Sequence, residues 1–386
     1  MKRLRELMST PVARIALPLM LVVFAAALPL LNVDVPGILP GPSYQAGAQQ
    51  MLAYAFLVAA LALSYHLMFG LSGMLSFGHA MFFALGAYGL AISLRQLAPK
   101  DWGTPVTFVA AIVITLVIGF VVATITGAVA LRVSGITFAM VTLAFAQALS
   151  VLARRNPGHL TGGEEGISVD TSVIPDALVG VRNTENLYWM ALGVLVLVYL
   201  VTLWVEKSRV GTVAAATRDN DLRVRVLGLQ PYLVKLFIAT AAAILAVVAG
   251  IGFVLLQSGT TPRITTSDFT LTLLVIVVLG GVGYRWGAIV GALVYTILDQ
   301  RLSALANSDF VAGLPAVLHV PLSEPLFILG TLFVLVVMFV PGGVAGTVNR
   351  WGRRSRARTG LARVEHAAEG AATAQAGGAG LGHANS

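Results

Sequence analysis

The residue types that usually carry enzymatic chemistry are scarce in this sequence. It has no cysteine, which excludes disulfides, iron–sulfur centres and thiolate zinc sites. Its six histidines, at positions 66, 79, 159, 319, 366 and 383, lack the HxxxH or HExxH spacing of a metalloenzyme. No lysine follows a glycine, so the GK[ST] core of a phosphate-binding loop is missing. We therefore expect a protein that is not an enzyme, with no metal site and no cofactor bound by this chain.

Hydrogen-bonding side chains gather in a glycine-rich stretch, GLSGMLSFGHAMFFALGAYG at residues 70–89. Irregular backbone persists inside a bilayer only where protein or a water-filled cavity satisfies its hydrogen bonds. One hypothesis is a candidate translocation path, with free backbone groups facing a polar ligand. The alternative is a tight turn between two helices, in which His79 bonds a nearby carbonyl. The residues assigned to the path are Gly70, Ser72, Gly73, Ser76, Gly78 and His79.

Charged side chains gather in a second stretch, between residues 206 and 231. A helix over 212–228 is predicted here, because Thr212 suits a helix start and Gly228 a helix end. Bare lipid headgroups would favour Lys and Arg without acids, so the mixed charges favour docking onto a partner protein. Two acid-before-base pairs at i,i+4 spacing would add about 0.2–0.5 kcal/mol each: Asp219–Arg223 and Asp221–Arg225. The candidate docking residues are Thr212, Arg218, Asp219, Asn220, Asp221, Arg223, Arg225 and Gly228.

The composition of the chain explains what must position these stretches. Its 386 residues are 57% hydrophobic and only 11% charged, with a mean hydropathy of +0.87, whereas soluble domains carry about 25% charged residues. A lipid span needs roughly 20 apolar residues. The fold class is therefore all-α, a polytopic membrane helix bundle of about ten transmembrane helices. The apolar runs are 12–31, 46–69, 78–97, 105–131, 135–152, 187–205, 234–257, 269–284, 286–302 and 323–341.

The placement of positive charge predicts the orientation. With alternating spans and an inner N-terminus, 18 of the 25 Lys and Arg fall in inner segments. Because Lys and Arg accumulate on the cytoplasmic side, both termini are expected to be cytoplasmic. The net charge of +8 is then a topology signal rather than a sign of nucleic-acid binding.

The two ends of the chain and one further glycine cluster complete the pattern. The first apolar run is long for a signal peptide, so a retained helix is favoured over a cleaved one. The segment 346–386 is basic and then rich in Ala and Gly, which predicts a disordered cytoplasmic tail. In LGGVGYRWGAIVGA (279–292), a tight turn at Gly283 precedes a GxxxG pair suited to helix packing, Gly287 and Gly291.

Five blocks of this sequence resemble the LivM-type permeases of ABC importers for branched-chain amino acids. In order they are residues 70–89, 130–149, 161–167, 209–237 and 277–293, and the likeness runs from about residue 45 to 345. The resemblance implies a transmembrane domain over 46–345, preceded by an N-terminal helix and outer loop (1–45) that it does not cover. It also implies that segment 212–228 is the family's coupling helix, which sits in a groove of an ATPase.

The same resemblance implies partners, energy source and location. We expect a second, LivH-like permease subunit, two ATP-binding subunits that hold ATP and Mg, and a periplasmic substrate-binding protein, all at the cell inner membrane. Transport would proceed by alternating access. Three alternatives stay open: a urea or short-amide importer of the same architecture, a secondary transporter that works without an ATPase, and a membrane enzyme. The spans carry few buried acids or bases, which argues against a proton-coupled carrier.

Overall fold

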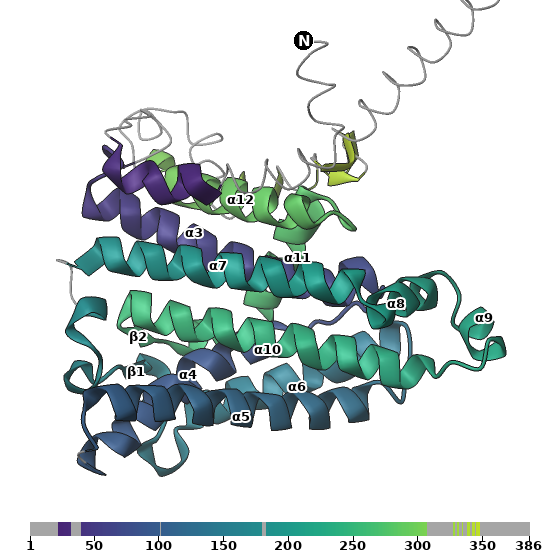
Figure 1. The fold of residues 1–386 in the computed structure, drawn as a ribbon, viewed down its shortest axis with the longest axis horizontal. Coiled ribbons are helices and arrows are strands. Elements are labelled where there is room, and N and C mark those ends of the chain that lie inside the picture. Colours follow the sequence, from purple (N-terminus) through teal and green to yellow (C-terminus); the bar gives the residue numbers. More distant parts are fainter. Residues whose placement is uncertain are drawn as a thin grey trace, which may run out of the picture.

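The protein is a bundle of long helices, seen in Figure 1 with their axes roughly horizontal. The computed structural model describes residues 22–31, 40–100, 102–179 and 183–306, with scattered positions between 327 and 347. Within these ranges, six helices are long and apolar enough to cross a membrane: α3 (Ala46–Tyr65, extended by a π-helical turn to Leu71), α4 (Ala80–Leu97), α5 (Thr104–Ala130), α6 (Ile136–Arg155), α7 (Thr184–Lys207) and α10 (Pro231–Gln257).

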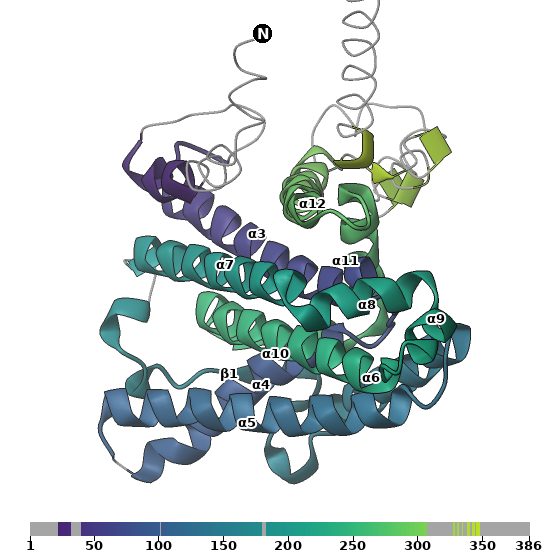
Figure 2. The ribbon, with the colours of Figure 1, turned by 45° about the vertical axis from the view of Figure 1, so that its right-hand side comes forward.

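Shorter elements join these spans at both ends of the bundle. At one end, α8 (Arg209–Asp219) and α9 (Asp221–Val226) connect α7 to α10. At the opposite end, β1 (Ile167–Ser168) pairs antiparallel with β2 (Gly259–Thr260), with Ile167 opposite Thr260. Helices α11 (Ser267–Gly280) and α12 (Arg285–Ala306) follow. The two views agree that α8 and α9 lie at the end opposite β1 (Figures 1 and 2).

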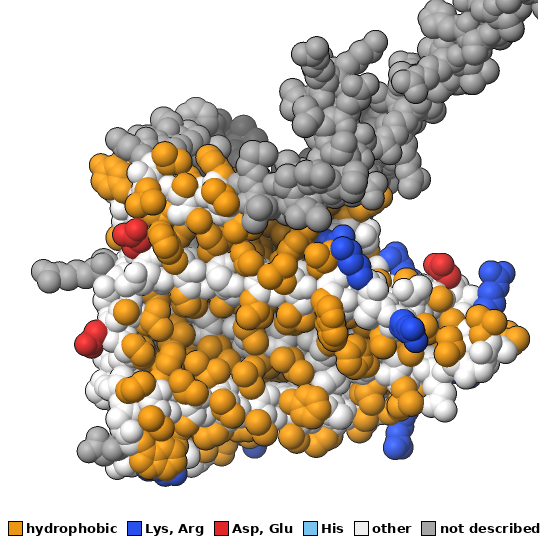
Figure 3. Space-filling view, viewed as in Figure 1, with side chains coloured by type: hydrophobic (Ala, Val, Ile, Leu, Met, Phe, Trp, Pro, Cys, Tyr) orange, Lys and Arg blue, Asp and Glu red, His pale blue; other side chains and the backbone are white. Residues whose placement is uncertain are grey.

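The centre of the bundle is formed by α3 and α10, which are mostly buried, whereas α5 presents most of its surface to the outside. The exposed side chains of α5 are large and apolar, as at Val113, Val117 and Phe120. Figure 3 shows such hydrophobic side chains over the middle of one face, with charged side chains at its two ends. This distribution is the one that a lipid bilayer requires, so the chain is a multi-pass membrane protein.

Glycines let α4 and α10 pack with their backbones in direct contact. A Cβ atom on Gly86 of α4 would overlap the carbonyl oxygen of Val247 in α10, and one on Gly250 of α10 would overlap that of Phe83 in α4. Between lipid-embedded helices the association comes mainly from van der Waals packing, which small residues permit. The α4–α10 contact therefore depends on both glycines.

Within the described residues, six of the predicted spans are present as long helices, and two others differ from the prediction. The runs 269–284 and 286–302 were expected to be two spans, but α11 and α12 form a pair bent by 118° at a short break. Helix α11 has 14 residues, about 21 Å, which is less than the roughly 30 Å of a bilayer core. It starts late because residues 258–266 turn back into the bundle, where Thr265 is buried and bonds Ser150 of α6. The runs 12–31 and 323–341 lie largely outside the described residues.

Charge distinguishes the two ends of the bundle. Among described residues, the end that carries α8 and α9 has eight Lys and Arg against three Asp and Glu, and the opposite end has six against seven. The positive-inside rule thus predicts that the α8–α9 end faces the cytoplasm. The expected cytoplasmic termini lie outside the described residues.

We predict that Gly250→Val will destabilise the bundle. The added side chain meets a backbone carbonyl that cannot rotate away, and overpacking of this kind costs about 1–3 kcal/mol or more. The apparent melting temperature of the detergent-purified protein should fall by roughly 1–4 °C or more. Gly193→Val on α7 is the control, because a Cβ there meets nothing within 4 Å. Equal melting temperatures for the two variants would contradict the packing role of Gly250.

Candidate functional site

The α8–α9 segment protrudes beyond the ends of the long helices, with α9 as its outermost part (Figure 1). It is two helices rather than the single helix predicted over 212–228. Asn220 adopts an extended conformation (φ −163°, ψ 106°) that ends α8, and its side chain accepts hydrogen bonds from the backbone N–H of Leu222 (2.9 Å) and Arg223 (3.1 Å). An asparagine is a strong N-cap, so it starts a second helix where it interrupts the first.

The start and the stop of the segment are set by two short-range motifs. The predicted start at Thr212 was wrong: α8 begins at Arg209, and the Ser208 hydroxyl accepts from the Gly211 N–H at 3.1 Å. The stop at Gly228 is as predicted. Gly228 has φ +79°, and the bonds Gly228 N–H to Arg225 C=O and Leu229 N–H to Val224 C=O form a Schellman motif.

The acidic residues of the segment hold different partners from those predicted. Within the described chain, neither predicted pair forms an ion pair. The break at Asn220 puts Asp219 and Arg223 on different helices, whereas Asp221 shares α9 with Arg225 but has another partner. Asp221 instead contacts Lys235 of α10, with Nζ and Oδ2 at 2.6 Å. This pair fixes the start of α9 to the bundle.

The surface of the protrusion is more apolar than its charges suggest. Its inward face is made by Gly211, Ala214 and Thr217 of α8 and Val224 of α9. Its outer tip carries three large apolar side chains that are 69%, 80% and 76% exposed, namely Leu222, Val226 and Leu227. We call these three residues the apolar tip. The sequence alone hinted at it, since DLRVRVLGL holds more apolar residues than one helix face can bury.

A polar junction lies beneath the protrusion. Glu206, near the end of α7, contacts His66 Nε2 at 3.0 Å through one carboxylate oxygen and Arg285 Nε at 2.9 Å through the other. His66 follows α3 and is 3% exposed, and Arg285 begins α12. One carboxylate therefore joins three helices, and Gly211 packs α8 directly against the carbonyls of residues 205 and 206. Sequence analysis missed this junction because its members are far apart along the chain; His66 and Glu206 alone are separated by 140 residues.

Arg218 connects the protrusion to the glycine-rich break. Its guanidinium donates to the carbonyl of Gly70, and its aliphatic stem lies against Gly73, which has φ +72°. The same guanidinium lies near Gly283, which has φ +95° in the turn between α11 and α12. The structure thus brings together three stretches that the sequence singled out separately.

The break itself is buried, and protein groups satisfy much of it. The Tyr65 hydroxyl donates to the Ser76 carbonyl (3.0 Å), and the Thr142 hydroxyl of α6 accepts from the Phe77 N–H (3.1 Å). The Ser72 hydroxyl donates to Met68 C=O. His79, fully buried, bonds the Ser64 hydroxyl at 2.9 Å, rather than the carbonyl that the turn hypothesis expected.

These hydrogen bonds agree better with the tight-turn hypothesis than with the hypothesis of an open translocation path. Ser76 and Gly78 still line a cavity with a free volume of about 20 Å³, next to Thr142. The predicted helix-packing residues Gly287 and Gly291 lie directly against α11. Cβ atoms at these positions would meet the carbonyls of Gly280 and Ile276.

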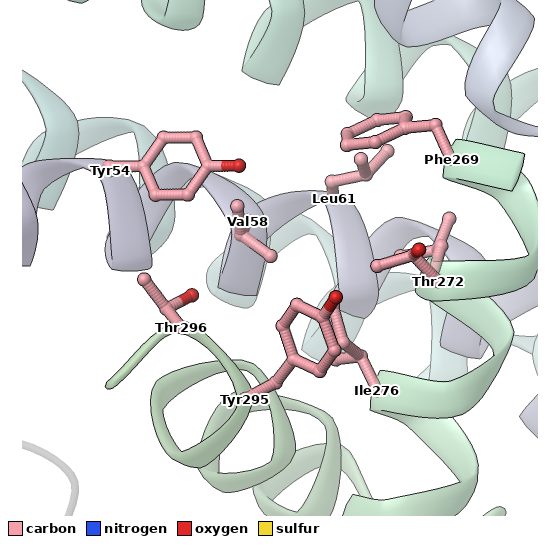
Figure 4. Close-up of a pocket in the computed structure, with 9 residues that line it drawn as sticks. Tyr54, Val58, Leu61, Phe269, Thr272, Ile276, Tyr295 and Thr296 are labelled. Carbon is pink, nitrogen blue, oxygen red and sulfur yellow. The ribbon is translucent and has the colours of Figure 1, made fainter. Parts of the chain in front are cut away.

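A second cavity lies between α3, α11 and α12 (Figure 4). Its hydroxyl groups come from Tyr54, Thr272, Tyr295 and Thr296, and its apolar wall includes Val58, Leu61, Phe269, Leu273 and Ile276. Its free volume is about 10 Å³, which is roughly the space of one water molecule. No sequence motif marked this site, because its lining comes from three helices at ordinary spacing.

These features define a class: a multi-pass membrane protein with a protrusion that carries exposed apolar side chains at its positively charged end. Residues 47–340 match the family described as branched-chain amino acid transport system, permease component. Because the match covers most of the chain, the chain belongs to this family.

Individual relatives agree with this assignment. The high-affinity branched-chain amino acid transport system permease protein LivM of Escherichia coli is 27% identical over 310 residues, 74% of this chain and 66% of that protein, just under two thirds of its length. The probable LivM protein of Methanocaldococcus jannaschii is 25% identical over 317 residues, 74% of this chain and 89% of that protein. The autoinducer 2 import system permease protein LsrC of Yersinia enterocolitica is 29% identical over 197 residues, 48% of this chain and 51% of that protein. No solved structure matches the chain.

Because the chain has no cysteine, single-cysteine variants can test the orientation of the protrusion. We predict that a membrane-impermeant maleimide added to intact spheroplasts labels Asp170→Cys, which is exposed at the β1 end, but not Val226→Cys. Both variants should react after the membrane is permeabilised. Labelling of Val226→Cys in intact spheroplasts would reverse the orientation and exclude a cytoplasmic docking role.

Proposed function

We propose that this protein is a transmembrane permease subunit of an ATP-driven importer for branched-chain amino acids, working by alternating access. The observation that carries the proposal is the protrusion: an exposed apolar tip, flanked by Arg223 and Arg225, fixed to the ends of three helices. Exposed apolar side chains with charged neighbours at the water-facing end of a membrane protein suit a protein partner better than lipid. A secondary transporter works without an ATPase, so its inner loops need not present such an element.

The partners follow from the family and from the chemistry that this chain lacks. We infer that ATP and Mg are held by two ATP-binding subunits, one of which receives the apolar tip. A second, LivH-like permease subunit would complete the passage, and a periplasmic binding protein would deliver the amino acid. The complex would lie in the cell inner membrane.

The coupling route that we propose runs through the junction. Closure of the ATPase subunits would move α8 and α9. Because Gly211 packs α8 directly against the backbone at the end of α7, α7 would move with them. Glu206 would pass this movement to α3 through His66 and to α12 through Arg285, while Arg218 would pass it to the break after α3. Such a route works only if the docked ATPase prefers one conformation of these helices over the other.

We predict that Leu222→Ser combined with Leu227→Ser weakens binding of the ATP-binding subunits at least tenfold. Two exposed apolar side chains would each lose roughly 1–2 kcal/mol of burial at the interface. The measurement is co-purification of the ATPase from detergent extracts, together with ATP-dependent leucine uptake. Leu160→Ser, an exposed leucine at the opposite end, is the matched control and should behave like the wild type. Full ATPase recovery with the double variant would rule out docking at this tip.

We predict that Glu206→Gln separates docking from transport. The amide keeps the shape of the side chain but removes the charge that both His66 and Arg285 contact, and hydrogen bonds to charged groups contribute about 1.5–3 kcal/mol. ATPase co-purification should persist, while leucine uptake per ATP hydrolysed falls at least about fivefold.

The control for this variant is Glu185→Gln, an exposed glutamate at the other end of the same helix. It should leave the coupling ratio unchanged. If Glu206→Gln also leaves that ratio unchanged, the junction is structural and the coupling route is wrong.

A further inference from the structure

The cavity between α3, α11 and α12 combines features that a structural gap does not need. Figure 4 places the hydroxyls of Tyr54, Tyr295 and Thr296 around one apolar space. Thr296 is only 1% exposed, and its hydroxyl has no hydrogen-bond partner among the described residues. An unpaired buried hydroxyl costs free energy unless a ligand or water completes it.

The depth of the cavity suits a transport site. Tyr54 precedes His66 by twelve residues on one helical course, and Tyr295 follows Arg285 by ten, so both lie about 15–18 Å from the junction. That distance is about half of a roughly 30 Å hydrocarbon core. Substrate sites of transporters lie near this midplane and are commonly formed by discontinuous helices. The bent pair α11–α12 supplies such a discontinuity.

The lining matches one class of ligand. Hydroxyl groups of Tyr54, Tyr295 and Thr296 can donate to a carboxylate. Asp299 lies one turn beyond Tyr295 on α12, so its carboxylate can stabilise an ammonium group on the same side of that helix. The apolar wall of Val58, Leu61, Leu273 and Ile276 suits an aliphatic side chain.

We propose that this cavity is the station at which the permease holds the zwitterionic head and the aliphatic side chain of an amino acid during its passage. The inference rests on the proposed function. With about 10 Å³ free, the site is closed in this structure and opens only when α3 and α12 separate. These are the two helices whose ends Glu206 joins, so opening of the station is under the control of the junction.

The first test removes hydroxyls from the station. Purified full complexes are reconstituted in liposomes, and leucine uptake per ATP is measured with saturating, preloaded binding protein. Tyr54→Phe, Tyr295→Phe and Thr296→Val should each lower uptake about three- to tenfold, the equivalent of one lost hydrogen bond. The matched control is Tyr88→Phe, which removes a buried, unpaired hydroxyl of α4 that lines neither cavity.

The second test changes the apolar wall and measures selectivity, which a purely structural role would not alter. Val58→Ala enlarges the station, so it should raise the ratio of leucine to valine uptake about two- to fourfold, the worth of up to one methylene group. Each amino acid is supplied on preloaded binding protein, so the selectivity of that protein cancels. Val254→Ala, a buried valine of α10 outside the cavity, should leave the ratio unchanged.

The outcomes separate the two proposals. If the wild-type complex shows no ATP-dependent uptake of leucine or valine, the proposed function fails. If the wild type transports both but the hydroxyl variants equal Tyr88→Phe and the Val58→Ala ratio is unchanged, the station is wrong while the function stands.

Discussion

The organisation of this bundle depends on one shared carboxylate. Glu206 offers one oxygen to His66 and the other to Arg285, at 3.0 and 2.9 Å, in a position that is only 18% exposed. A partly buried carboxylate held by an imidazole nitrogen and a guanidinium is costly to disrupt, because loss of either contact leaves a poorly solvated group behind. The ends of α3, α7 and α12 are therefore held as one unit, and the protrusion is built directly on it.

Glycine contacts divide the rest of the bundle into stiff pairs. Helices α4 and α10 meet at Gly86 and Gly250, and α11 and α12 meet at Gly287 and Gly291, in both cases at backbone distance. Close-packed interfaces of this kind shift between discrete arrangements and do not deform gradually. Helix α3 lies between the two pairs, in contact with α10 and α12. Relative movement is thus expected between the pairs, along the faces of α3.

The sequence predicted the helices better than their connections. Continuous apolar runs identified the six long spans of the described residues, because a helix satisfies its backbone hydrogen bonds internally and needs only sufficient apolar length to cross the bilayer. The glycines at 281 and 283 predicted a tight turn, but hydropathy gave no measure of the 118° bend between α11 and α12. Asn220 did carry a local signal, as a preferred N-cap inside an expected helix. The Glu206 junction and the tyrosine cavity carried no such local signal, because contacts between helices far apart in the sequence do not appear as a residue spacing.

The geometry of the two polar sites suggests why they share helices. The junction lies at one end of α3 and α12, and the cavity lies about 15–18 Å along both. A tilt of about 10° about the junction would displace each helix by roughly 3 Å at the level of the cavity. Two helices that tilt apart by that amount gain about 6 Å, enough to change a space for one water into a space for an aliphatic side chain. In the mechanism that we propose, a small rotation imposed on the protrusion would thereby be amplified at the cavity, without any rearrangement inside the glycine-packed pairs.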